Sequence, residues 1–522
     1  MNVRAIPLAI DALVAALASG RPLVLLDVRD VVESERGHIP GAAVLPRRHI
    51  EFRIDALVRD RATPLVTVDG GEDIGDGRRD PRAALAADTL LALGYRDAVA
   101  LDGGVAAWHA AGLPLVAGAQ VSAQAFGRRV GDVERVPSVD VDTFRRWQLE
   151  GRRIALCDVR SPSEHAEGCI PGAVSLPGFE VVSHAVDMAA EADVFVLCSS
   201  ARTRSMIVAR TLIDLGLGDV VALEGGTLAW RLAGLPLETG SHRRRVPPSR
   251  AARQFAQLGA ARLARHVGVG AIEAAELAAL VDAGNGNFNV FDLRNLGRHV
   301  AAHVPRSVSV NSDALLVCSE ELVAVRDAPT VLVDDDVVRA QLAGAWLRRL
   351  GLTDVRELAG GFAAWPHAGR PASTAPDLPL GWREAIAVAP GLGAEDAGRW
   401  LAMHEPARVL HVDTGASFRR GHLPGAVWLP RGWLEARIDT VASTSGDPVL
   451  LTCADGSQAA YAAATLRQRG HAHVAWLQGG TRQWGAAGRA LETSALPPAE
   501  HELQLPARLG AQEMRDYLSR EC

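Results

Sequence analysis

The sequence contains no lysine and few cysteines, and these scarcities narrow the possibilities. All 55 basic residues are arginines, against 61 acidic residues, so the net charge is −6. A mildly acidic chain has no basic footprint for nucleic acid, so we predict no nucleic-acid partner. Six cysteines in 522 residues are too few and too scattered for a disulfide framework. They also lack the paired spacing of a metal site, so we predict neither metal nor cofactor.

Long apolar runs are also missing. No uninterrupted stretch approaches the roughly 20 residues that a membrane helix needs, so we predict no membrane partner. The first twenty residues carry Asp11 inside their apolar stretch and have no basic start, which makes a poor signal peptide. We therefore expect a cytoplasmic protein. A chain of this length should hold three or four domains of ordinary size.

A glycine-glycine-tryptophan motif occurs four times, which indicates an internal repeat. The four copies are Leu101-Asp-Gly-Gly-Val-Ala-Ala-Trp108, Leu223-Glu-Gly-Gly-Thr-Leu-Ala-Trp230, Leu358-Ala-Gly-Gly-Phe-Ala-Ala-Trp365 and Leu477-Gln-Gly-Gly-Thr-Arg-Gln-Trp484. Another glycine precedes each pair by nine residues. A strand, a tight turn and a helix explain this spacing, with the tryptophan packed on the sheet as core.

A second motif opens each repeat at a constant spacing. Its first residue precedes a proline by 13 positions each time, since 40−27, 171−158, 305−292 and 424−411 all equal 13. The four copies begin at Asp27-Val-Arg29, Asp158-Val-Arg160, Asp292-Leu-Arg294 and His411-Val-Asp413. An aspartate and an arginine at a strand end can form a buried ion pair that supports the neighbouring loop. We expect that supporting role for Asp158 and Arg160.

Together these motifs resemble the rhodanese family. The resemblance implies an α/β fold with four tandem domains, each a parallel sheet with helices on both faces. We place the domains at 1–118, 136–240, 272–375 and 390–492, followed by a C-terminal tail at 493–522. In active members of the family, a cysteine follows a strand and the loop that begins there holds the transferred sulfur.

Aspartate occupies the reactive position of two repeats. Counting five residues from the start of the preceding strand places Asp69 in the first domain and Asp334 in the third. A carboxylate there cannot accept sulfur and would repel an anionic donor. We therefore predict that the first and third domains are inactive.

The fourth domain has Cys453 at the reactive position but lacks the arginine expected in its loop. Gln458 takes that place, and Asp455 adds a negative charge beside the thiol. Both changes should raise the thiol pKa and weaken anion binding. His411 and Asp413 also replace the usual Asp-x-Arg pair, which removes the expected support. We predict a degenerate domain, with Cys453 as a possible second site.

The second domain keeps nearly every family element, yet two ways of counting disagree on its cysteine. Counted from the strand start, Cys198 is the reactive residue; counted back 17 residues from the helix-ending Gly216, Ser199 is. Either the loop is one residue longer, or the cysteine has slipped back into the strand. We favour the longer loop, because loops absorb insertions more easily than strands do.

On that interpretation the second domain is the catalytic one, and the chain is a thiosulfate sulfurtransferase-like enzyme. Thiolate Cys198 would take sulfane sulfur from thiosulfate or a similar anionic donor as a persulfide, and pass it to cyanide, a thiol or a protein acceptor. No general base is needed if the thiolate is preformed. The loop is expected to bind the donor through Ser199, Ser200, Ala201, Arg202, Thr203, Arg204 and Ser205.

Two alternatives stay open. From Cys198 to Arg204 the sequence reads Cys-x5-Arg, which also resembles rhodanese-fold phosphatases and arsenate reductases. For these, Glu164 and His165 are candidates for a general acid only by their proximity in sequence. The other alternative is a non-catalytic rhodanese scaffold, which the degenerate repeats make plausible.

Overall fold

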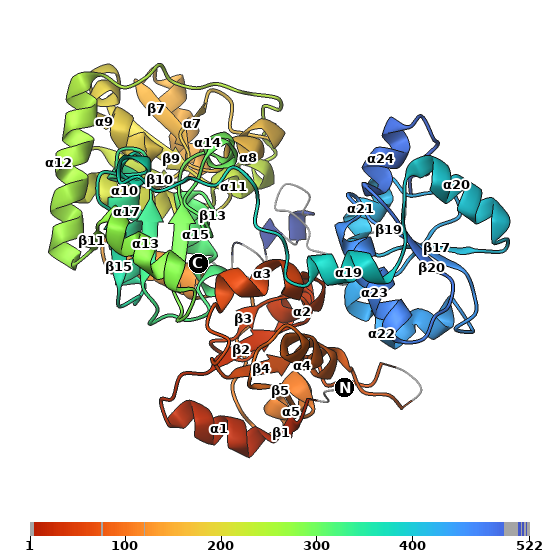
Figure 1. Cartoon of the computed structure of the whole chain (residues 1–522). Coiled ribbons are helices and arrows are strands. Elements are labelled where there is room, and N and C mark those ends of the chain that lie inside the picture. The colour runs from red at the N-terminus through yellow and green to blue at the C-terminus, as the bar shows by residue number, and fades with distance from the viewer. Residues whose placement is uncertain are drawn as a thin grey trace. The chain divides into compact units, whose positions relative to one another are not determined.

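The computed structural model contains four five-stranded parallel sheets, and it describes residues 5–74, 77–118, 121–494, 510–512, 514, 515 and 518. Each sheet has the same order, with the second strand of a domain next to its third and fourth. The predicted α/β class with four tandem domains is therefore confirmed (Figure 1). The predicted C-terminal tail falls largely outside the described residues.

The first two domains run from β1 to α11. The first comprises β1 (Pro7–Leu8), α1 (Ile10–Ala18), β2 (Val24–Asp27), α2 (Val31–Arg36), β3 (Ala43–Val44), η1 (Arg47–His49), α3 (Ile50–Leu57), β4 (Leu65–Val68), α4 (Arg82–Ala92), β5 (Ala98–Leu101) and α5 (Gly104–Ala110). The second, preceded by α6 (Val121–Asp132), comprises β6 (Ser138–Val139), α7 (Val141–Leu149), β7 (Ile154–Asp158), α8 (Pro162–Glu167), β8 (Val174–Ser175), α9 (Glu180–Glu191), β9 (Val194–Cys198), α10 (Thr203–Asp214), β10 (Val220–Leu223) and α11 (Gly226–Leu232).

The last two domains repeat this order. The third, preceded by α12 (Arg250–Val267), comprises β11 (Gly270–Ile272), α13 (Ala274–Ala283), β12 (Asn289–Asp292), α14 (Leu296–Ala301), β13 (Val308–Ser309), α15 (Ser312–Val317), α16 (Ser319–Leu322), β14 (Thr330–Val333), α17 (Val338–Arg349), β15 (Val355–Leu358) and α18 (Ala364–His367). The fourth, preceded by α19 (Trp382–Val388), comprises β16 (Gly391–Leu392), α20 (Ala394–Met403), β17 (Arg408–His411), α21 (Gly415–Arg420), β18 (Val427–Trp428), η2 (Arg431–Trp433), α22 (Leu434–Arg437), η3 (Ile438–Thr440), β19 (Val449–Thr452), α23 (Ser457–Gln468), β20 (Val474–Leu477) and α24 (Gly480–Ala486).

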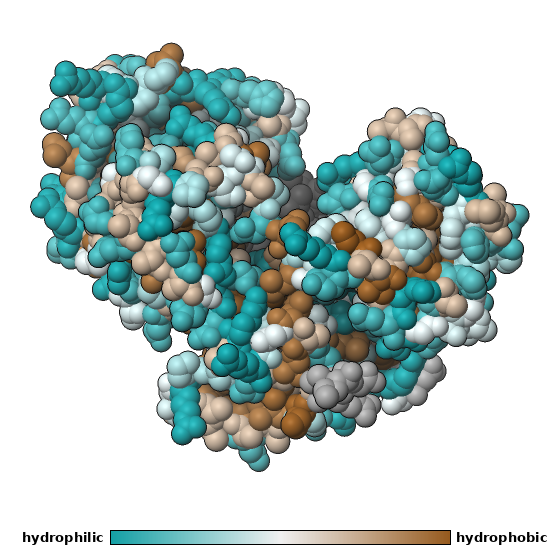
Figure 2. All heavy atoms as spheres, viewed as in Figure 1, coloured by the Kyte–Doolittle hydropathy of each residue, from teal (hydrophilic) through white to brown (hydrophobic). Residues whose placement is uncertain are grey.

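The domains pair in a nested way. One compact unit joins the first and fourth domains, residues 1–119 and 378–503. The other joins the second and third, residues 120–377 and 504–522. Inside the second unit, a single apolar cluster continues from one domain into the next, and Trp346 of α17 donates its indole N–H to the hydroxyl of Thr211 of α10 at 2.8 Å. On the face shown in Figure 2, hydrophilic side chains predominate.

Apolar side chains cover both faces of each central strand. In β9, Phe195 and Leu197 pack into one cluster, while Val194, Val196 and Cys198 pack into another on the opposite face. Successive residues of a strand point to opposite sides, so a continuous apolar run means a strand that is covered on both faces. A shift of one residue along such a strand therefore moves a side chain to the other face.

The glycine pairs form tight turns and the tryptophans pack in the core, as the repeated motif predicts. Each of the eight glycines has a positive φ, between 50° and 74°. The four tryptophans donate their indole N–H to a backbone carbonyl six residues later, at 2.9–3.0 Å. The tryptophans thus close the turn after the helix, and they are buried.

Val337 supplies a stability prediction. It has a φ of 61° at the position where the fourth domain has Gly456, whose φ is 91°. A β-branched residue in this left-handed region is strained by about 1–3 kcal/mol. We expect Val337→Gly to raise the free energy of unfolding by about 1 kcal/mol in chemical denaturation, after the extra backbone entropy of glycine is subtracted. As a control, Ala340→Gly in the unstrained helix should lower it by about 1 kcal/mol; a loss in both variants would contradict the strain.

Candidate active site

The four reactive positions can be compared through the strands that precede them. Asp27, Asp292 and His411 pair with Val68, Val333 and Thr452, the last residue of each strand. The next residue is therefore the first of the loop. It is Asp69, Asp334 or Cys453, as the sequence predicts.

In the second domain the same comparison selects Ser199. Asp158 pairs with Cys198, so Cys198 is the last residue of the strand and corresponds to Thr452. The hydrogen bonds after the strand agree, because the carbonyls of Ser199 and Cys453 accept from the equivalent N–H groups of Thr227 and Thr481 at 3.0 and 2.9 Å.

The predicted longer loop is therefore wrong. Strands β7 and β9 have five residues where their counterparts have four, and the additional pair, Ile154 with Val194, lies at their start. A count of five from the strand start holds only for a four-residue strand, so here it stops one residue short, at Cys198 instead of Ser199. From Ser199 to Gly216 is 17 residues, as from Cys453 to Gly470 and from Asp334 to Gly351.

Burial decides the chemistry of Cys198. Its side chain is fully buried in the apolar cluster that contains Phe144 and Trp230. This cluster lies on one face of the second-domain sheet, whereas the side chain of Cys453 lies on the other face of the fourth-domain sheet. Burial, followed by the neighbouring charge of Asp158, raises the pKa of the Cys198 thiol well above its ordinary value. The expectation of a preformed thiolate at Cys198 does not hold, because desolvation disfavours the charged form.

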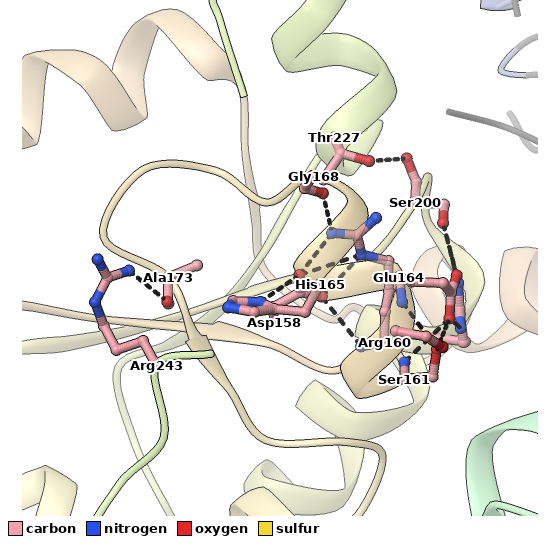
Figure 3. Close-up of polar contacts among 12 residues, drawn as sticks. Asp158, Arg160, Ser161, Glu164, His165, Gly168, Ala173, Ser200, Thr227 and Arg243 are labelled. Carbon is pink, nitrogen blue, oxygen red and sulfur yellow. Dashed lines mark hydrogen bonds and ion pairs between the residues drawn. The ribbon is translucent and has the colours of Figure 1, made fainter. Parts of the chain in front are cut away.

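Both arginines of the second-domain loop are occupied by carboxylates (Figure 3 shows the neighbouring polar contacts). Arg204 donates to both oxygens of Glu164 at 2.9 and 2.7 Å and to Asp313 of the third domain at 3.3 Å. Arg202 donates to Asp132 at 2.7 Å. The structure thus gathers the predicted loop residues around Ser199, but it engages their positive charge in ion pairs.

The supporting pair of the second domain is present. Arg160 donates to both oxygens of Asp158 and to the carbonyl of Gly168, at 2.7 Å. His165 adds a contact of 3.0 Å to Asp158 and is itself buried (Figure 3). The same buried aspartate–arginine pair recurs in the first and third domains.

Cys453 lies in a loop that contacts its sulfur. The backbone N–H of Gly456 donates to Sγ at 3.1 Å, and the thiol lies 3.7 Å from Oδ1 of Asp455. Burial, with the charges of Asp413 and Asp455, raises the pKa of Cys453 to about 12, while backbone N–H groups of the loop lower it. The predicted rise of this pKa agrees with the structure.

Asp413 restores part of the support that the sequence had appeared to lose. Its Oδ2 accepts a hydrogen bond at 3.2 Å from the N–H of Ala454, the residue that follows Cys453. His411, at the place of the usual aspartate, is buried, which lowers its pKa to about 4 and leaves the ring neutral. This contact of Asp413 was not predictable from the family pattern, which has an arginine at this position, because the pattern compares residue types and not contacts.

The family model for the rhodanese-like domain matches residues 10–111, 140–233, 273–368 and 396–487. The chain belongs to the rhodanese-like family. A solved thiosulfate sulfurtransferase from Pseudomonas aeruginosa is similar over 99% of this chain and 96% of its own, with 31% identity and a TM-score of 0.86.

Two curated relatives each match about a fifth of the chain. A sulfurtransferase of Allochromatium vinosum is 31% identical over 102 residues, which is 20% of this chain and 94% of that protein. A putative sulfur carrier protein of Bacillus subtilis is 27% identical over 95 residues, 18% of this chain and 51% of that protein. These similarities support a transferase of the sulfurtransferase type.

The two aspartate-bearing rhodanese domains use their carboxylates internally. Asp334 pairs with Arg339 at 3.1 Å, and Asp69 accepts from the N–H groups of Gly71 and Ala83 at 3.0 and 2.9 Å. Burial and the nearby Asp80 raise the pKa of Asp69 to about 7.

Among the described residues no cluster of His, Cys, Asp and Glu could hold a metal ion. Within the same described ranges, no helix is both long and apolar enough to cross a membrane.

Proposed function

We propose that the protein is a sulfurtransferase whose sulfur-accepting residue is Cys453 of the fourth domain. The contact between the Gly456 N–H and Sγ carries this proposal, because it joins a thiol at the reactive position to a backbone donor. Backbone donors stabilise the negative charge on the thiolate and on the persulfide that follows. Cys198 is then a core residue of the second domain.

In the proposed reaction the Cys453 thiolate attacks the outer sulfur of thiosulfate or a similar sulfane donor. A bond forms between the two sulfurs, the bond to the sulfonate sulfur breaks, and sulfite leaves with that electron pair. A thiophilic acceptor such as cyanide, a small thiol or a protein thiol then attacks the outer sulfur of the persulfide. The thiolate of Cys453 is the leaving group of this second step.

The position of Cys198 does not support the alternative of a phosphatase or an arsenate reductase. It required Cys198 as the first residue of a loop that ends at Arg204, but Cys198 belongs to β9 and Arg204 is paired with Glu164 and Asp313. The scaffold alternative is distinguished by experiment.

Mass spectrometry of the whole protein treated with thiosulfate, followed by peptide mapping, tests the proposal. We expect one additional sulfur atom on the peptide that contains Cys453, which cyanide removes as thiocyanate. An added sulfur on the Cys198 peptide would instead favour the second domain. If no persulfide forms with thiosulfate or with an organic persulfide donor, the scaffold alternative is favoured.

A further inference from the structure

Two reciprocal ion pairs join the first and fourth domains. Arg47 pairs with Glu435, and Arg431 pairs with Glu51. The residues are equivalent in their domains: each arginine follows a proline and donates its backbone N–H to the carbonyl of a valine, at 2.9 Å, and each glutamate comes four residues later. All four side chains are buried. The two pairs should therefore contribute similarly to the stability of this interface.

The pair Arg431–Glu51 contacts the Cys453 loop, by which we mean residues 453–458, the last two of which begin α23. Nη1 of Arg431 donates to Glu51 at 2.9 Å, to the carbonyl of Arg48 at 3.0 Å and to Oε1 of Gln458 at 3.5 Å. Nε2 of Gln458 donates to that same carbonyl at 3.0 Å. Both ends of the Gln458 amide are thus held by groups that the first domain supplies or orients.

Gln458 lies close to the reactive sulfur along the chain. It belongs to the first turn of α23, two residues after Gly456, whose N–H contacts Sγ. Because backbone geometry is continuous over so few residues, the position of the Gln458 side chain constrains the direction of that N–H group. A displacement of about 1 Å at such a donor is enough to change a rate by a large factor.

The other pair of domains shows the same arrangement with different residues. Arg204 is equivalent to Gln458, and it contacts Asp313 of the third domain, which is equivalent to Arg48 of the first. Gln458 and Arg204 each lie five positions after the first residue of their loop, Cys453 or Ser199. Each contacts the other domain of its unit, and the residues contacted, Arg48 and Asp313, are at equivalent positions. This recurrence is independent support for a link from the partner domain to the loop.

We propose that Glu51 and the Arg48 carbonyl of the inactive first domain are positioning groups for the Cys453 loop. The proposal rests on the proposed function, in which Cys453 accepts sulfur. The first domain is then a working part of the active site: Glu51 holds Arg431, and Arg431 together with the Arg48 carbonyl fixes Gln458.

The reciprocal pairs provide a matched experiment on the full-length protein. Glu51→Gln and Glu435→Gln each leave one buried arginine without its carboxylate at the same interface, so both should lower the melting temperature to a similar extent. Of the two substitutions, only Glu51→Gln removes the carboxylate that is hydrogen-bonded to Arg431, the arginine that contacts Gln458. We expect it to slow both the loading of Cys453 with sulfur and its alkylation by iodoacetamide about tenfold, while Glu435→Gln changes either rate less than about twofold.

A second variant leaves the interface ion pairs intact. Gln458→Ala should slow both reactions about as much as Glu51→Gln, and the double variant should lose little more, because the two residues act through one link. Equal rates in Glu51→Gln and Glu435→Gln, or an unchanged rate in Gln458→Ala, would overturn the positioning role. Alkylation reports on the loop even if wild-type Cys453 takes up no sulfur, a result that would refute the proposed function alone.

Discussion

Cys453→Ala is expected to abolish sulfur transfer, whereas Cys198→Ala is expected to leave the rate within about twofold of wild type. Removal of the attacking group costs on the order of a thousandfold or more. Cys198 lies on the other face of a sheet in an apolar cluster, so its loss should cost only stability, about 1 kcal/mol. Thiocyanate formation from thiosulfate and cyanide measures the rates, and denaturant unfolding measures the stability.

Cys157→Ala is the matched control for this pair, since Cys157 is another buried strand cysteine of the second domain. It should resemble Cys198→Ala in both measurements. Transfer that survives Cys453→Ala and disappears in Cys198→Ala would reverse the assignment and restore the second domain as the catalytic one.

The reactivity of Cys453 is expected to depend steeply on pH. Because burial and two carboxylates raise the pKa of the thiol to about 12, the thiolate fraction at neutral pH is small. Alkylation by iodoacetamide should therefore rise about tenfold for each pH unit between about pH 8 and pH 10. An exposed thiol of ordinary pKa would level off within this range. The rate at the Cys453 peptide is measured by quantitative mass spectrometry.

Asp455→Asn should increase that rate about tenfold at pH 8. It removes a negative charge that lies 3.7 Å from the sulfur, and the loss of a like charge lowers the pKa of the thiol. Iodoacetate, which is anionic, should gain more than neutral iodoacetamide, because Asp455 also repels the reagent.

Asp447→Asn serves as the control for Asp455→Asn. Asp447 belongs to the same domain, but its carboxylate is held by Thr444. This variant should leave both alkylation rates unchanged. A plateau above pH 9 in wild type, or an equal gain with both reagents in Asp455→Asn, would contradict the electrostatic explanation.

The repeats made the fold predictable from the sequence. Glycine pairs, the tryptophans and the constant 13-residue spacing each reflect a local requirement: a positive φ, a turn closed by an indole N–H, or a strand-end ion pair. Local requirements leave residue types at fixed intervals, so they can be read without coordinates. Residue counting likewise placed Asp69, Asp334 and Cys453 at the first position after their strands.

The error at Cys198 has an equally definite cause. Whether an additional residue enters a strand or a loop depends on pairing with the neighbouring strand, and the pair Ile154 with Val194 appears only when β7 and β9 lie side by side. Since successive residues alternate between faces, this single pair decides whether a thiol enters the site or the core. Hydropathy does not separate the two, because cysteine suits both places.

The sequence by itself determined that four rhodanese-like domains follow one another and that two of them carry aspartate at the reactive position. Only the tertiary structure decided that Ser199, and not Cys198, occupies the position equivalent to Cys453 in the second domain, and that Asp413 and the first domain contact the Cys453 loop. The physical reason is distance along the chain. Contacts such as Glu51 with Arg431 join residues 380 positions apart, and no periodicity or local motif encodes them.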